Sequence, residues 1–591
     1  MNDFGSEPAT LCEAFQATVA AHPGRTALRT VGGAASMTWS EYGDRVRSIA
    51  AGLAGLGVGP GGSVAMMMTN RPEFHLCDTA VMHTGAISFS VYNTNPAHVI
   101  AYQLDNADAR VVVCERQFLP VIRSAIAEGG KVDHVICLDA RRGDGAMTLA
   151  DLEAAPAPDF DFDDAWRAVD SQDVLTIVYT SGTTGMPKGV EITHANLLAS
   201  ARLLDEMSRW SADDRLISYL PDAHMANRWL SHYTAIQTGM SITAVPNVKE
   251  VIAALTDARP ALFLGVPRIW VKMKVGLESA IAAKPFAQRQ LITWALRVGT
   301  NIARANTAGR QPGLLDRMRF ALASPVLAKI RAQLGLDRIR VAVSSTAPVP
   351  VEVMEFVTGL GIPVCEAWGL TEGTCALTIN RPDRIRLGTV GTPVPGTEIR
   401  LAPDGEILAR GPQTMRGYRK APEKTAEAID ADGWLHTGDV GEMDADGYLR
   451  IVDRKKELII NAAGKNMSPA NIENAIIANT PLAGPVVTIG DGRPYNTALI
   501  TLDPDAVAEF AAKNGLAGAT AELAREPKVH AAIQAGVDAA NQTLSRVEQI
   551  KKFVIVPDVW EPGGEYLTPT TKLRCKPIAA GYANLIDELY R

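Results

Sequence analysis

The sequence predicts an α/β protein with three parts: a large N-terminal domain of parallel-rich sheets flanked by helices, a β-rich subdomain, and a small α+β C-terminal domain. Over the first 270 residues, segments with helical apolar spacing alternate with short apolar runs, a pattern typical of parallel strands joined through helices. From residue 388 to 452, short strand-like segments and turns follow one another directly, which indicates the β-rich subdomain.

The first predicted helix has one apolar face, formed by Tyr42, Val46, Ile49, Leu53 and Leu56. A glycine-rich stretch at 57–62 ends it. This stretch matches the dinucleotide-binding pattern G-x-G-x-x-G, but that pattern needs a strand before it and a helix after it, and here the order is reversed. We interpret it as a turn. Helices are expected at 73–85 and 96–105, and strands at 63–68, 87–92, 110–115, 131–139, 174–180, 216–221, 241–246, 261–267 and 340–344.

Residues 268–340 are mostly helical in pattern and strongly basic, with 14 Lys and Arg against 3 Asp and Glu, although the whole chain has a formal charge of −7. One interpretation is a solvated face with scattered cations. The other is attraction to an anionic membrane surface or to the phosphates of a ligand. After the β-rich stretch, a new run of helices and strands begins near Asp453. The predicted domains are therefore 1–453 and 454–591.

Composition limits the class of protein and its location. A charge of −7 is small for 591 residues and argues against a protein that binds nucleic acid over its whole surface. The seven cysteines are scattered, as expected for reduced thiols in a cytosolic protein. The N-terminus lacks the apolar core of a secretory signal, and no apolar run approaches the roughly 18 residues that span a bilayer. We expect a cytoplasmic protein, at most peripheral to the inner face of a membrane.

A polyphosphate site is predicted at residues 179–189 (YTSGTTGMPKG), which follow an apolar strand. Small residues let backbone N–H groups approach an anion, hydroxyls donate further hydrogen bonds, and Lys188 adds a positive charge. The loop is not a Walker A motif, because Lys188 follows Pro187 rather than glycine.

This loop resembles the phosphate-loop signature of the adenylate-forming superfamily, which includes acyl-CoA synthetases, luciferases and the adenylation domains of peptide synthetases. Further segments resemble other motifs of the superfamily in the expected order: 220–224 (LPDAH), 265–270 (GVPRIW), 344–348 (SSTAP), 368–372 (WGLTE), 434–439 (WLHTGD), 453–457 (DRKKE) and 568–572 (TPTTK). In the third of these, Ser345 and Thr346 replace the usual glycines. The segments GVPRIW and LTPTTK are most similar to those of long-chain acyl-CoA synthetases.

The resemblance implies a nucleotide site. The phosphate loop is expected to hold the β- and γ-phosphates through Thr180, Ser181, Gly182, Thr183, Thr184, Gly185 and Lys188. Glu372 is the expected Mg²⁺ ligand, with Thr180, because Mg²⁺ prefers carboxylate and phosphate oxygens. The adenosine and its α-phosphate are expected to contact Ala347, Trp368 (stacking on adenine), Gly369, Thr371 (near the α-phosphate), Asp439 (accepting from the ribose hydroxyls) and Arg454.

The resemblance also implies that the C-terminal domain is a mobile lid that rotates about Lys456 between two half-reactions. Lys572 is then expected to contact the substrate carboxylate during adenylation. His224 is expected near the substrate, either as a structural residue or beside the acyl pocket, and Trp229 is expected to line the acyl tunnel.

The expected activity is ATP-dependent conversion of a long-chain fatty acid to acyl-AMP and pyrophosphate, followed by transfer to coenzyme A. Such an enzyme uses ATP, Mg²⁺ and coenzyme A, and no nucleic acid. One alternative is an acyl-AMP ligase that delivers the acyl group to a carrier protein. Another is a non-catalytic lipid or nucleotide binder, which the joint presence of Lys188, Glu372, Asp439 and Lys572 disfavours. The sequence leaves the oligomeric state open.

Overall fold

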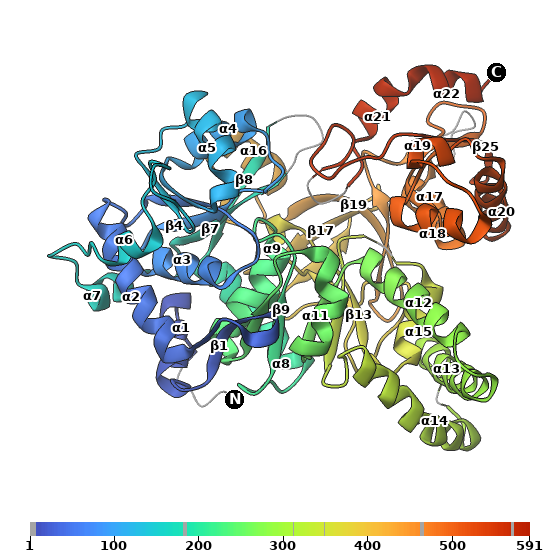
Figure 1. Ribbon diagram of the computed structural model, residues 1–591, viewed down its shortest axis with the longest axis horizontal. Coiled ribbons are helices and arrows are strands. Elements are labelled where there is room, and N and C mark those ends of the chain that lie inside the picture. The colour runs from blue at the N-terminus through green and yellow to red at the C-terminus, as the bar shows by residue number, and fades with distance from the viewer. Residues whose placement is uncertain (1–6, 181–185, 311, 348, 461–465, 569–571) are drawn as a thin grey trace.

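The computed structural model describes residues 7–180, 186–310, 312–347, 349–460, 466–568 and 572–591 (Figure 1). A seven-stranded sheet forms the core of the N-terminal region in the order β18-β8-β7-β4-β3-β5-β6. Its strands are β3 (Ser63–Met67), β4 (Ile87–Ser90), β5 (Ala109–Cys114), β6 (His134–Cys137), β7 (Val174–Thr180), β8 (Lys188–Thr193) and β18 (Gly417–Tyr418). The strands β4, β3, β5, β6 and β7 pair in parallel. Strand β8 is antiparallel to β7, and β18 forms the edge, antiparallel to β8.

The helices that cover this sheet begin and pack as their sequences predict. Helix α2 (Trp39–Gly55) starts at a capping box, in which Thr38 accepts from the Glu41 N–H and the Glu41 side chain accepts from the Thr38 N–H. In its predicted apolar stripe, Tyr42, Val46, Ile49 and Leu53 are buried, and Leu56, at the C-cap, is partly buried. The glycine-rich stretch 57–62 is the turn between α2 and β3, as expected. The other helices of this region include α3 (Pro72–His83), α4 (Ala97–Ala107) and α5 (Leu119–Ala127).

Two further sheets complete the large N-terminal region. One has the order β2-β1-β10-β9, with β1 (Thr26–Thr30), β2 (Ser36–Thr38), β9 (Arg215–Ser218) and β10 (Ser241–Ala244). The other has the order β11-β12-β13-β14-β15, with β11 (Leu262–Gly265), β12 (Val341–Ser344), β13 (Val364–Trp368), β14 (Thr378–Ile379) and β15 (Thr392–Pro393). The strands expected between 63 and 344 are therefore confirmed, with shifted ends.

The segment expected to be helical, 268–340, contains α12 (Pro267–Ala282), α13 (Phe286–Thr307) and α14 (Leu314–Gln333). The β-rich stretch forms an antiparallel sheet of β16 (Glu398–Leu401), β17 (Glu406–Arg410), β19 (Leu435–Met443) and β20 (Leu449–Arg454). Within the described ranges, no helix is long and apolar enough to cross a membrane.

The C-terminal segment forms its own α+β layer at the upper right of Figure 1. Its sheet contains β23 (Ala483–Ile489), β24 (Asn496–Leu502) and β25 (Ile550–Ile555), packed against α17 (Pro469–Asn479) and α20 (Pro527–Thr543) around a separate apolar core. Helix α18 (Pro504–Asn514) faces α12, where Arg268 pairs with Asp503. The α/β fold class is confirmed. The division at 453/454 stays a prediction.

Candidate active site

The predicted site residues gather around one cavity of about 4540 Å³. Four strands end at its wall, because Ser90 ends β4, Thr180 ends β7, Ser344 ends β12 and Trp368 ends β13. Ligands of open α/β sheets bind at this edge. The predicted residues that line the cavity are Thr180, Lys188, His224, Ala347, Trp368, Gly369, Thr371, Glu372, Asp439, Arg454, Lys456 and Lys572. The other predicted phosphate-loop residues, Ser181, Gly182, Thr183, Thr184 and Gly185, lie outside the described residues.

Tyr418 joins Lys188 to Glu372. Strand β18 pairs antiparallel with β8, so the Tyr418 side chain lies beside that of Lys188. Lys188 Nζ donates to Tyr418 Oη at 2.7 Å, and this hydroxyl donates to Glu372 Oε1 at 2.8 Å. The same Nζ lies 3.9 Å from the centroid of the Tyr418 ring. Burial lowers the pKa of Lys188, and the Glu372 carboxylate opposes this shift. Sequence reasoning missed Tyr418, which belongs to none of the recognised motifs.

Asp439 is held by two partners at the far side of the cavity. Trp368 Nε1 donates to Asp439 Oδ2 at 2.8 Å, and Arg454 Nε lies 3.2 Å from Asp439 Oδ1. Arg454 stands directly opposite Asp439 in the β19–β20 ladder, which explains why these two motifs meet. Trp368 is buried against the apolar core of the β-rich sheet, and its N–H orients the carboxylate. Stacking of adenine on the Trp368 ring stays a prediction.

Lys572 reaches the same cavity from the C-terminal segment. A short hairpin holds its backbone, because the Lys572 N–H donates to Thr568 Oγ1 at 2.9 Å and the Thr568 N–H donates to the Lys572 carbonyl at 2.8 Å. Removal from water lowers the pKa of Lys572, and Arg454 adds to this effect. The carboxylates of Asp439, Glu457 and Glu372 oppose it. Folding therefore brings Lys572 into the electrostatic neighbourhood of the predicted Mg²⁺ and ribose residues.

His224 lies at the start of a short helix, α9 (Met225–Asn227), on the cavity wall. Its Nδ1 accepts a hydrogen bond from the Ala226 N–H at 3.1 Å, so the ring proton is on Nε2. Burial lowers the pKa of His224 to about 4, and the nearby Lys572 charge adds to this effect. The imidazole is therefore neutral near pH 7 and caps a helix. This geometry fits the structural interpretation, and a contact with substrate stays a prediction.

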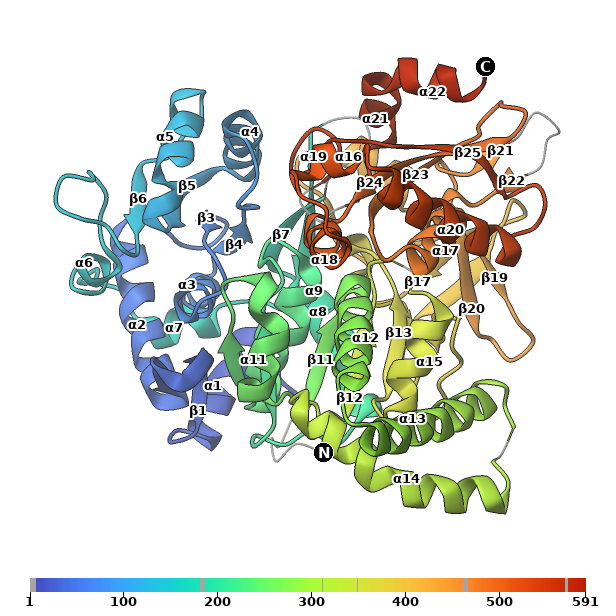
Figure 2. The same ribbon diagram turned by 45° about the vertical axis from the view of Figure 1, so that its right-hand side comes forward.

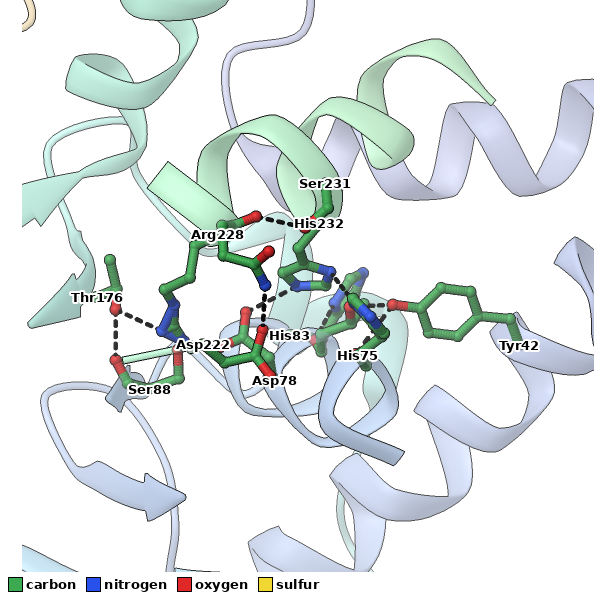
Figure 3. Close-up of polar contacts among 12 residues, drawn as sticks. Tyr42, His75, Asp78, His83, Ser88, Thr176, Asp222, Arg228, Ser231 and His232 are labelled. Carbon is green, nitrogen blue, oxygen red and sulfur yellow. Dashed lines mark hydrogen bonds and ion pairs between the residues drawn. The ribbon is translucent and has the colours of Figure 1, made fainter. Parts of the chain in front are cut away.

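A buried ion pair lies behind the turn that carries His224 (Figure 3). Arg228, the first residue of a π-helical segment, pairs with Asp78 of α3. The Arg228 guanidinium also donates to Ser88 Oγ on β4 and to Thr176 Oγ1 on β7, both at 3.0 Å. Burial alone would raise the pKa of Asp78, but Arg228, His232 and Ser88 together outweigh it and hold that pKa well below its usual range. The pair fixes the segment after His224 against the strand that ends at the phosphate loop.

Two histidines extend this cluster away from the cavity (Figure 3). His232 Nε2 lies 2.9 Å from Asp78 Oδ2 and donates to it, so His232 Nδ1 is the acceptor for His75 Nδ1–H at 2.9 Å. Burial lowers the pKa of both imidazoles. Sequence reasoning missed the whole cluster. Its members lie up to 157 residues apart and form no local pattern that could have revealed them.

Trp229 does not line this cavity, and its expected place in an acyl tunnel stays a prediction. Its ring is buried and borders a separate apolar void of about 10 Å³, next to Leu203, Leu262 and Val343. The π-helical turn that directs Arg228 toward Asp78 directs the next residue, Trp229, into this core.

Backbone geometry explains two positions in the motifs. A Cβ at Gly369 would lie 1.7 Å from the Cys375 carbonyl oxygen, so the WGLTE motif needs glycine there for close packing. Thr346, by contrast, has φ +79°, a conformation that favours glycine. This is the loop in which the family often has glycine, so the chain keeps the backbone shape at the cost of local strain.

The oxygen donors of the cavity suit Mg²⁺. The Glu372 carboxylate and the Thr180 hydroxyl both line it, and both are hard ligands. Among the described residues, no group of three or more His, Cys, Asp or Glu side chains could hold a metal ion. A Mg²⁺ ion at Glu372 would therefore depend on substrate phosphate oxygens for the rest of its coordination.

Comparison with known proteins gives consistent matches. Residues 15–419 match the AMP-binding enzyme family, and residues 456–591 match the AMP-binding enzyme C-terminal domain. A protein named as a fatty-acid–CoA ligase, fadD11, of Mycobacterium tuberculosis is 50% identical over 452 residues, which cover 76% of this chain and 79% of the relative. The long-chain-fatty-acid–CoA ligase FadD15 of Mycobacterium bovis is 33% identical over 94% of this chain and 92% of the relative.

Solved structures share the fold at low identity. The anthranilate CoA ligase AuaEII, solved with anthranoyl-AMP, has a TM-score of 0.73 at 20% identity and covers 97% of this chain and 98% of its own. ATP-bound MatB from Rhodopseudomonas palustris has a TM-score of 0.71 at 22% identity, with coverage of 97% and 99%. The sequence motifs, the cavity at the strand ends and the match over both regions agree: the chain belongs to the AMP-binding enzyme family.

Proposed function

We propose that the protein activates a fatty acid with ATP and transfers the acyl group to coenzyme A. In the first step, a carboxylate oxygen of the acid attacks the α-phosphorus of ATP, and pyrophosphate leaves as acyl-AMP forms. In the second step, the thiolate of coenzyme A attacks the acyl carbonyl carbon and AMP leaves. The relatives named as fatty-acid–CoA ligases support the substrate class. One observation carries the proposal: Lys188, Glu372, Asp439 and Lys572 line a single cavity.

The first step brings two anions together, so its main requirement is positive charge held in place before reaction. Lys188 is held by the Tyr418 hydroxyl at the start of β8, where it pairs with Thr180 in the β7–β8 ladder. Lys572 approaches from the other side, near Asp439 and Arg454. We assign Lys188 to the outer phosphates, Asp439 and Arg454 to the ribose, and Lys572 to the acid carboxylate. Glu372 and Thr180 would hold Mg²⁺, which neutralises phosphate charge when bound.

The proposal also covers the acceptor of the acyl group and the chain length of the fatty acid. The same first step serves an acyl-AMP ligase that delivers to a carrier protein, so the acceptor is decided by comparing coenzyme A with a holo carrier protein. We propose a long-chain acid because FadD15, which matches over 94% of this chain, is named for long-chain acids. We also propose that residues 454–591 act as the lid, with Lys456 as its hinge; Lys456 lies in the exposed turn between β20 and β21 (Ile459–Ile460).

We also propose where the enzyme acts in the cell. A cytoplasmic enzyme that takes a lipid-soluble acid gains from contact with a membrane surface, and segment 268–340 offers an excess of cations for it.

The test is fatty-acid-dependent ATP–pyrophosphate exchange over a ladder of chain lengths, followed by addition of coenzyme A. Lys572→Ala should reduce exchange strongly and spare thioester formation from supplied acyl-AMP. Lys551→Ala, at an exposed lysine outside the cavity, is the matched control. Equal loss in both half-reactions would refute the role of Lys572. Absence of AMP release with every fatty acid tested would refute the proposed function.

A further inference from the structure

Helix α14 exposes several large apolar side chains that the fold does not use. Leu314, Leu315 and Leu322 expose 77%, 69% and 71% of their surface, and Met318 exposes 58%. The helix projects with α13 from the body of the protein at the lower right of Figure 2. Contiguous exposed apolar residues on a soluble fold mark an interaction site.

These four residues share one face of the helix. At 100° per residue, Leu314, Leu315, Met318 and Leu322 fall within an arc of about 100°. The residues that attach α14 to the body lie on the opposite side and are buried, namely Ala323, Leu327 and Ile330. Helix α14 therefore has two apolar faces. The inner face, formed by Ala323, Leu327 and Ile330, packs on the body of the protein. We call Leu314, Leu315, Met318 and Leu322 the outer face.

Cations surround the outer face. Arg317 and Arg319 flank it on either side around the helix, and both are exposed. In residues 286–333 only Asp316 is acidic, whereas the basic residues are Arg289, Arg297, Arg304, Arg310, Arg317, Arg319, Lys329 and Arg331. Arg289, Arg297 and Arg310 have no carboxylate within ion-pair distance among the residues that the structure describes. An apolar face within a positive surround is complementary to an anionic bilayer.

We propose that the outer face of α14 docks on an anionic lipid bilayer, with its leucines and methionine among the acyl chains and the flanking arginines at the lipid phosphates. This inference rests on the proposed function, since an enzyme for lipid-soluble acids gains from such docking. A second copy of the chain is disfavoured as the occupant, because two such cationic surfaces repel each other. A nucleic acid would use the arginines but leave the apolar face in water.

Helix α13 adds a second exposed apolar group next to α14 along the chain. Its first half exposes Phe286, with 68% of its surface accessible, as well as Leu291 and Trp294. Helix α12, which lines the cavity through Val271, Val275 and Ser279, precedes α13 and is joined to it by a short turn. The same stretch of chain therefore carries part of the cavity wall and both groups of exposed apolar side chains.

The experiment is co-sedimentation of the full chain with phosphatidylcholine vesicles that contain 30% phosphatidylglycerol, at low and high salt. The test variant is Leu314→Gln/Leu315→Gln/Leu322→Gln, in which glutamine keeps helix propensity. The matched control replaces three exposed apolar residues elsewhere by glutamine: Val31, Leu401 and Val547. Both variants are assayed on octanoic acid in solution without vesicles, and their sedimentation velocity is compared with that of the wild type.

We expect the wild type and the control variant to bind anionic vesicles, more weakly at high salt. The test variant should lose at least tenfold in vesicle affinity at both salt concentrations and keep wild-type activity on octanoic acid. Three results would overturn the inference: no binding of the wild type to the vesicles, equal binding of the test variant, or a wild-type dimer that the test variant dissociates. Failure of all three proteins with octanoic acid and also with a long-chain fatty acid would instead count against the proposed function.

Discussion

Replacement of Tyr418 by Phe tests the link between the two charged ends of the phosphate site. The change removes the hydroxyl that accepts from Lys188 Nζ at 2.7 Å and donates to Glu372 Oε1 at 2.8 Å. A hydrogen bond to a charged group contributes about 1.5–3 kcal/mol. Because both partners line an open cavity, water replaces part of this loss, so we assign about 1.5–3 kcal/mol to the two bonds together.

This loss should appear in acyl-AMP formation. A deficit of about 1.5–3 kcal/mol corresponds to a roughly 10- to 150-fold decrease in kcat/KM for fatty-acid-dependent ATP–pyrophosphate exchange. The phenyl ring keeps the cation–π contact, in which Lys188 Nζ lies 3.9 Å from the centroid, so the free energy of unfolding should change little. Thioester formation from synthetic acyl-AMP does not involve the outer phosphates and should stay within about threefold of wild type.

Tyr448→Phe is the matched control. Tyr448 also lies under a cation, with Arg386 Cζ 4.0 Å from its ring centroid, and its hydroxyl donates to the Arg384 carbonyl at 3.1 Å. It lies outside the cavity, so exchange should be unchanged. If Tyr418→Phe retains wild-type exchange, or if both half-reactions decrease equally, the bridge between Lys188 and Glu372 does not position the phosphate site.

Three other predictions concern stability. Asp78→Asn leaves the buried Arg228 charge without its carboxylate and should lower the free energy of unfolding in urea by about 3–5 kcal/mol. Gly369→Ala places a Cβ 1.7 Å from the Cys375 carbonyl oxygen and should cost about 1–3 kcal/mol in the same assay. Burial lowers the pKa of His83 from 6.5 to about 3, so the unfolded chain binds more protons at this residue between these values. The stability that His83 contributes should be constant above about pH 6.5 and decrease as the pH falls below it, measured as the difference in thermal unfolding between the wild type and His83→Gln across pH.

Controls for these predictions come from the same chain. Asp163→Asn removes an exposed ion pair with Arg47 and should cost less than about 1 kcal/mol. Gly59→Ala meets nothing within 4 Å at its Cβ and should be nearly neutral. If Asp78→Asn and Asp163→Asn lower the free energy of unfolding equally, the argument from the buried ion pair is wrong. If Gly369→Ala and Gly59→Ala lower it equally, the argument from close packing at Gly369 is wrong. A difference between the wild type and His83→Gln that grows in favour of the wild type on acidification from pH 6 would contradict a neutral buried His83.

The sequence was sufficient to predict the fold class and a set of residues that share the cavity, for a physical reason. Site residues such as Thr180 and Trp368 stand at the ends of apolar strands, where an apolar run followed by polar residues can be recognised in the sequence. The surroundings of Trp229 could not be predicted, because the π-helical turn that directs its ring into the core has no signature in the sequence. Tyr418 was missed because it reaches Lys188 only through the pairing of β18 with β8.

The contacts that sequence could not supply share one property: they give each of these charges at the cavity a partner inside the chain. Lys188 reaches Glu372 through Tyr418, and Arg454 pairs with Asp439. Lys572 lies among carboxylates that oppose the lowering of its pKa. A cation removed from water without such partners would lose its proton or destabilise the fold. The triphosphate of ATP carries more negative charge than any of these side chains, so we expect the bound nucleotide to replace some of these partners. The chain can therefore hold cations in a partly desolvated cavity and still make them available to an anionic substrate.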